Sequence, residues 1–229
     1  MVLPIFMVSE YVGAVVLLLI TGIAAILFGL FMVLDFLKNK KIHHLLWALS
    51  FIVLFVAGII LVLTNDYSLL LSPIVAALAV LIPGGIAAGL LFVVFEEKTK
   101  LYGYIYLIFV LVMVILIGIA KAVDSPGAPA TVMIAHIPSG LLIILLPIYT
   151  TYKTKDTDWK ALLMSIGGIV VSIAGLLLAL FRIGPGDTAL LTLILTLLPI
   201  ILLLAAIFFA FGMLLPEKWS FAIPGIKKE

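Results

Sequence analysis

The sequence contains no cysteine, and only 10% of its 229 residues are charged. Without cysteine the chain can form no disulfide bond, thiol nucleophile, iron–sulfur cluster or thiolate metal site. Soluble domains contain about a quarter charged residues, so this composition, with a mean hydropathy of +1.46, excludes a soluble fold. The formal net charge of +2 is too small for a nucleic-acid-binding surface, and we expect no nucleic-acid partner.

Sequence motifs of catalysis are missing as well. The sequence has no Walker loop, paired-histidine zinc motif, nucleophile elbow or dinucleotide-binding fingerprint. We therefore expect no catalytic residues and no metal site, and a protein that is not an enzyme.

The sequence consists mainly of long apolar runs. A helix needs about 20 residues to cross roughly 30 Å of hydrocarbon, because it rises about 1.5 Å per residue. Seven runs are long enough, which predicts an all-α integral membrane protein with one heptahelical domain. The predicted spans are 11–34, 45–63, 69–95, 101–120, 130–149, 161–181 and 189–215, followed by a short tail at 216–229.

Basic residues fall mainly on one side of this topology. The loops after the first, third and fifth spans, together with the tail, contain Lys38, Lys40, Lys41, Lys98, Lys100, Lys153, Lys155, Lys160, Lys218, Lys227 and Lys228. The opposite side has only Lys121 and Arg182. Because short cytoplasmic loops retain lysine and arginine, we expect a cell-membrane protein with its N-terminus outside and its C-terminus in the cytoplasm.

Two spans that run in the same direction share a sequence template. Pro83-Gly84-Gly85 precedes Lys98-Thr99-Lys100, and Pro138-Ser139-Gly140 precedes Lys153-Thr154-Lys155 at the same proline-to-lysine separation. This pattern predicts three parallel helical hairpins followed by a seventh helix. The alternative is that proline and glycine are common in membrane helices and that topology alone requires the lysines.

Prolines and small residues predict how the spans bend and pack. Pro83, Pro138 and Pro199 lie well inside predicted spans. Each should kink its helix, because proline removes a backbone hydrogen bond and leaves a carbonyl that either packs against a neighbour or lines a cavity. Small residues four positions apart predict close helix packing at Gly85 with Gly89 and at Gly168 with Ser172.

Carboxylates are absent from the middle of every predicted span, which argues against a proton pump or a carboxylate-coupled antiporter. Seven spans with an external N-terminus resemble the layout of the microbial rhodopsins, in topology alone. That resemblance implies a retinal-bearing lysine in the seventh helix. The span 189–215 contains no lysine, so retinal is excluded.

His136 is the one ionisable residue well inside a predicted span, on the outer-leaflet side. Met133 and Ser139 lie three residues to either side and share its helix face, which makes the three residues a candidate ligand-binding site. His136 either forms a hydrogen bond with a neighbouring helix or binds a quinone or lipid head group. Bis-histidine haem is not expected, because His43 and His44 lie in the first inner loop and cannot face His136 at the same depth.

The first inner loop is basic. Lys38, Lys40 and Lys41 accompany His43 and His44, a pattern that favours contact with anionic lipid head groups or with a partner protein. The absence of glutamine and the excess of lysine over arginine are typical of heat-adapted proteins and favour a thermophilic prokaryotic source.

These features favour a non-catalytic integral subunit or scaffold of a larger membrane assembly, with other membrane proteins as partners and a quinone or lipid near the outer leaflet. Two alternatives stay open. One is a small-solute transporter or channel that uses the proline-kinked third, fifth and seventh spans. The other is a heptahelical sensor that acts through a separate effector protein.

Overall fold

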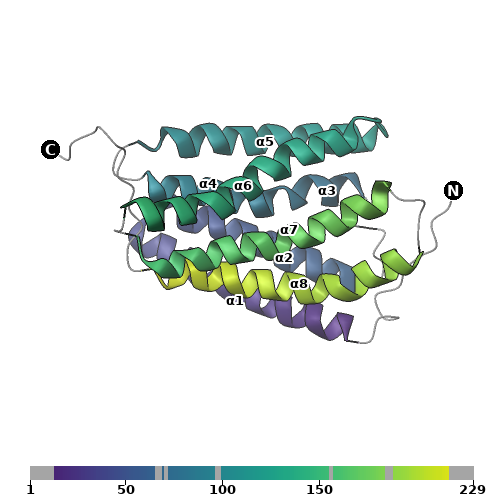
Figure 1. Ribbon diagram of the computed structural model, residues 1–229, viewed down its shortest axis with the longest axis horizontal. Helices are drawn as coiled ribbons and strands as arrows, with labels where there is room; N and C mark the ends of the chain where they lie inside the picture. Colours follow the sequence, from purple (N-terminus) through teal and green to yellow (C-terminus); the bar gives the residue numbers. More distant parts are fainter. Residues whose placement is uncertain are drawn as a thin grey trace.

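A computed structural model describes residues 13–64, 69, 72–95, 99–154, 157–183 and 188–216. Within these ranges the chain is helical and has no strand (Figure 1). The helices are α1 (Ala14–Asn39), α2 (Ile42–Thr64), α3 (Pro73–Ala79), α4 (Leu81–Val94), α5 (Leu101–Ala122), α6 (Ala128–Thr154), α7 (Leu162–Ile183) and α8 (Thr188–Leu214), with a 3-10 turn at Trp159–Ala161. Seven spans in these ranges are long and apolar enough to cross a membrane, with α3 and α4 together forming the third. The predicted all-α, seven-span membrane fold is confirmed.

Two helices extend beyond the apolar runs that predicted them. Helix α1 continues to Asn39, where the hydropathy prediction ended at Leu34, and α6 continues to Thr154. The end of α1 is set by backbone geometry, because Lys40 has a left-handed φ of 55° and its N–H bonds to the Phe36 carbonyl at 2.7 Å. Hydropathy therefore predicted the membrane-crossing part of these helices but did not predict where the helices end.

The third span is interrupted close to Pro83. Helix α3 ends at Ala79 and α4 begins at Leu81, as expected where proline offers no N–H to the carbonyl four residues earlier. The Ser50 hydroxyl of α2 donates to the Leu81 carbonyl at 3.0 Å, so a neighbouring helix supports the backbone at the break. The other prolines predicted to kink helices, Pro138 in α6 and Pro199 in α8, lie in helices that continue without a break.

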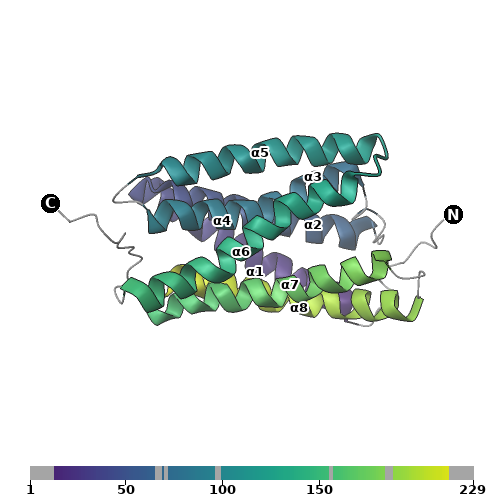
Figure 2. The same cartoon turned by 45° about the horizontal axis from the view of Figure 1, so that its top comes forward.

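Six helices form a closed ring. Helix α1 contacts α2, α2 contacts α4, α4 contacts α6, α6 contacts α7, α7 contacts α8, and α8 contacts α1. Helix α5 lies outside the ring, against α3, α4 and α6 (Figure 2). The two spans of each predicted hairpin are in contact, whereas the origin of the hairpins by duplication stays a prediction.

Apolar side chains from all six ring helices meet in one core cluster. Its larger members are Phe28, Met32, Trp47, Phe51, Ile86, Leu90, Ile143, Met164, Phe209 and Met213. Helix α4 is the most enclosed, since every residue from Gly84 to Val94 is buried. Lipid is as apolar as such a core, so close packing and cross-helix hydrogen bonds, rather than exclusion from water, hold the helices together.

Candidate functional site

The three residues of the predicted outer-leaflet site on α6 differ in their surroundings. The Nδ1 atom of His136 lies 3.0 Å from the carbonyl oxygen of Val132, in its own helix. Ser139 is fully buried and its hydroxyl shares a 2.8 Å hydrogen bond with the Tyr106 hydroxyl of α5. Met133 is 57% exposed on the outer surface of the bundle. The three side chains therefore lie in three different environments.

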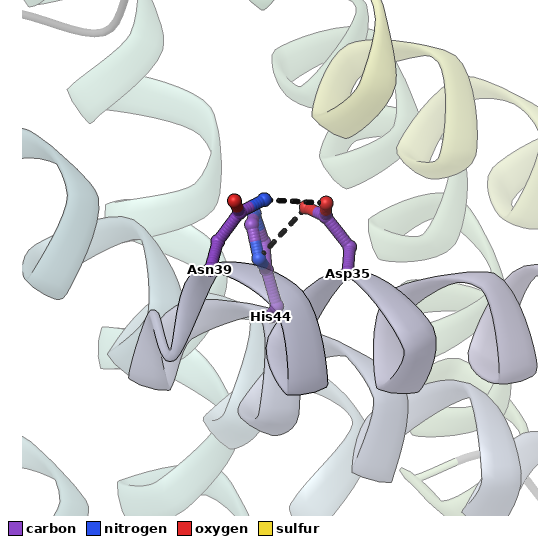
Figure 3. Close-up of polar contacts among 3 residues, drawn as sticks. All are labelled: Asp35, Asn39 and His44. Atoms are coloured by element: carbon purple, nitrogen blue, oxygen red, sulfur yellow. Dashed lines mark hydrogen bonds and ion pairs between the residues drawn. The ribbon is translucent and has the colours of Figure 1, made fainter.

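A polar cluster lies where α1 meets α2 (Figure 3). The carboxylate of Asp35 accepts a hydrogen bond from Asn39 Nδ2 at 2.6 Å through Oδ1, and its Oδ2 lies 2.9 Å from His44 Nδ1. Asp35 and Asn39 are four residues apart, which places them on one face of α1. The contact with His44 depends on the turn between the helices, which the sequence does not reveal. One carboxylate thus ties the end of α1 to the start of α2.

The turn itself depends on Lys40. Its left-handed backbone reverses the chain between α1 and α2, and its ammonium lies 5.9 Å from the centroid of the Phe36 ring. Lys38, Lys40 and Lys41 are all exposed at this corner. The corner therefore presents three exposed lysines close to the Asp35 carboxylate.

His43 departs from the expectation of a surface role. It is only 4% exposed, and its ring centroid lies 4.3 Å from that of His44 and 5.1 Å from the ring of Trp47. Positions 43 and 47 are one helical turn apart, so His43 packs on the indole beneath the corner. The lysines and the partly exposed His44 form the surface of the corner, and His43 belongs to its interior.

Helices α2 and α4 are in close contact through the glycines that the sequence singled out. A Cβ at Gly89 would overlap the Trp47 indole nitrogen, and a Cβ at Gly85 would overlap the Ser50 hydroxyl. The Trp47 Nε1 donates to the Ile86 carbonyl of α4 at 3.2 Å. This seam lies inside the ring, where it joins two helices of the same chain.

The second pair of small residues predicted to pack closely, Gly168 with Ser172, lies in two different surroundings. A Cβ at Gly168 would come within 2.8 Å of a side chain of α6, whereas Ser172 is exposed and its hydroxyl donates to the Gly168 carbonyl at 2.7 Å. The sequence analysis missed further contact glycines, among them a pair on α7 and α8: a Cβ at Gly167 would meet α8 at 2.8 Å, and one at Gly212 would meet α7 at 2.5 Å. They lie on facing helices, so no spacing within one helix links them.

Polar groups inside the described part of the bundle are few and scattered. The buried polar side chains are Thr21, His43, Ser50, Ser139, Thr150, Thr157 and Ser165. The hydroxyls of Ser50 and Ser165 donate to backbone carbonyls of neighbouring helices, at 3.0 and 2.7 Å. No group of three or more histidine, aspartate or glutamate side chains in the described ranges is placed to hold a metal ion. The Ser50 and Ser165 hydroxyls thus join neighbouring helices, whereas those of Thr21 and Thr150 donate to carbonyls of their own helices.

Outside the ring, a groove of about 400 Å³ opens on the surface of α6, lined by Leu145, Ile148, Tyr149, Tyr152 and Lys153. Comparison of the sequence with protein-family models, curated proteins and solved structures gives no match. A proposal for the function of this chain must therefore be argued from the geometry of the bundle.

Proposed function

We propose that this multi-pass membrane protein is a non-catalytic subunit or scaffold of a larger membrane assembly. The observation that carries the proposal is the closed ring, whose centre is filled by apolar side chains from all six of its helices. A membrane protein built this way offers its outer surface for function, through contacts with other proteins and with lipid. The predicted role of a quinone at His136 belongs to the same proposal and depends on a surface approach to α6.

The charged ends of the bundle support the proposed orientation in the membrane. The end of α1, the start of α2, the start of α5, the end of α6 and the start of the α7 segment lie at one end of the bundle (Figure 1). The described lysines at this end are Lys38, Lys40, Lys41, Lys100, Lys153 and Lys160. Lys121, near the end of α5, lies at the opposite end. The positive-inside rule supports a cytoplasmic location for the lysine-rich end.

Native purification tests the assembly. The tagged full-length chain is extracted from its own membranes in a mild detergent and its mass is measured by native mass spectrometry. We expect at least one other membrane protein to co-purify at a fixed stoichiometry and to be missing from a mock purification of untagged membranes. A lone monomer in every mild detergent would contradict the proposal.

A transporter or channel is the second candidate, and the interrupted third span favours it. Discontinuous helices near the middle of the membrane form substrate sites in many transporters. Here the break is covered by the buried apolar residues Val80, Val110, Met113 and Ile117. Solute flux in proteoliposomes distinguishes the two candidates: a scaffold gives no flux, whereas a transporter gives flux that Pro83→Ala reduces by making the helix continuous.

A further inference from the structure

The groove on α6 is an open surface groove of about 400 Å³. Its lining residues are Leu145, Ile148, Tyr149, Tyr152 and Lys153. Their spacing of three and four residues places them on one side of the helix, and Leu145 and Tyr152 are 55% and 74% exposed. The groove is therefore open to the surroundings of the bundle along its length.

The chemistry of the groove changes along the helix. Its start at Leu145 and Ile148 is apolar, its middle has the two tyrosines, and its end is the exposed cation of Lys153. This sequence spans about 12 Å at a rise of about 1.5 Å per residue and ends at the lysine-rich end of the bundle. Tyrosine is enriched at membrane–water interfaces, which places the end of the groove at the level of the lipid head groups.

We propose that this groove binds an anionic phospholipid. Its acyl chain lies over Leu145 and Ile148, and its phosphate contacts the Lys153 ammonium and the Tyr152 hydroxyl. Charge complementarity selects this ligand, because Lys153 is the single charged residue among the described residues that line the groove. Lysine binds phosphate as a point charge, and its long stem reaches from apolar surroundings to the head-group level. A zwitterionic lipid would fill the apolar part equally well but would gain less from the cation.

Lipid retention by the full-length protein tests the proposal. The protein is purified in mild detergent, incubated with equimolar dioleoylphosphatidylglycerol and dioleoylphosphatidylcholine, and examined by native mass spectrometry. We expect one phosphatidylglycerol to be retained in preference to phosphatidylcholine. Lys153→Ala should weaken this retention about fivefold, which corresponds to about 1 kcal/mol for one basic residue near a membrane surface.

Two further variants distinguish lipid binding in the groove from non-specific electrostatic attraction of lipid to the lysine-rich end of the bundle. Lys100→Ala removes another exposed lysine, next to the start of α5 at the same end of the bundle, and it should leave retention unchanged. Leu145→Trp fills the apolar part of the groove and should lower the retention of both lipids. Inorganic phosphate should not displace the lipid, because it lacks the acyl chain.

Four results would overturn the assignment. Equal retention of the two lipids would show that the charge of Lys153 plays no role. Equal losses in Lys153→Ala and Lys100→Ala would indicate diffuse electrostatic attraction. Displacement by inorganic phosphate would indicate a site for free anions. Loss of a co-purifying protein from Lys153→Ala with unchanged lipid retention would make the groove a protein interface.

Discussion

Replacing Gly89 by alanine tests whether the contact between α2 and α4 is as close as the structure indicates. The new Cβ would overlap the indole of Trp47, which is 1% exposed and cannot move toward open space. The indole must therefore shift, and its 3.2 Å hydrogen bond to the Ile86 carbonyl must lengthen or break. Gly89→Ala should thus destabilise the bundle even though alanine favours helices.

The magnitude follows from three contributions. Overpacking a core costs about 1–3 kcal/mol, and loss of the Trp47 hydrogen bond costs about 1 kcal/mol. Alanine in place of glycine inside a helix stabilises the helix by about 1 kcal/mol. The net expectation is a loss of about 1–3 kcal/mol, and each kcal/mol lowers Tm by roughly 2–4 °C for a chain of this size.

Thermal unfolding in detergent, followed by circular dichroism, measures the effect. Gly140→Ala is the matched control, since it lies inside α6 and no neighbouring atom lies within 4 Å of its added Cβ. That control should keep or raise Tm. A double-mutant cycle with Trp47→Phe, which removes the overlapping indole nitrogen, should give a coupling energy above about 0.5 kcal/mol.

Two results would refute the reasoning about this seam. One is a Tm for Gly89→Ala that equals or exceeds that of Gly140→Ala, which would mean that the helices have room to accept a side chain. The other is an equal cost of Gly89→Ala with and without Trp47→Phe, because the loss would then arise away from the indole.

Three smaller predictions concern polar groups. Ser50→Ala should cost about 1 kcal/mol in unfolding by detergent titration, because its hydroxyl supports a neighbouring helix at the break, whereas Ser172→Ala should change stability by less than about 0.5 kcal/mol. Asp35→Ala should lower the free energy of unfolding by at most about 1 kcal/mol, since the carboxylate is partly exposed. A loss of the same size in high salt and in low salt would exclude an ionic contribution. Thr151→Val should leave Tm unchanged or raise it, because the buried hydroxyl of Thr151 has no hydrogen-bond partner among the described residues. A clear fall in Tm would show that the hydroxyl has a partner.

The sequence was sufficient to predict the seven spans because membrane thickness imposes a length on apolar helices. It was insufficient for the ends of α1 and α6, since helices continue through polar residues until a turn such as that at Lys40 stops them. The effect of proline was also variable: the helix breaks near Pro83 and continues through Pro138, although both residues carry the same local signal. At the break the Ser50 hydroxyl of a neighbouring helix supports the Leu81 carbonyl, an interaction that the local sequence does not specify.

The candidate site was harder to predict for a related reason. Core and lipid are both apolar, so the hydrophobic pattern of a membrane helix does not say which face is buried. Ser139 is fully buried while Met133, on a face predicted to be shared, is exposed. His43 and His44 are adjacent in sequence, yet only the second contacts Asp35. These assignments need the three-dimensional arrangement of the ring.

The contact between α1 and α8 has a consequence for biogenesis. Ribosomes deliver α1 to the membrane before any other described helix and α8 after all of them. The face of α1 that later contacts α8 is therefore covered by lipid or by an insertion factor while five further spans insert into the bilayer. A translation arrest after α7 leaves the bundle open along one side, and such an unsealed intermediate is a natural substrate for membrane quality-control proteases.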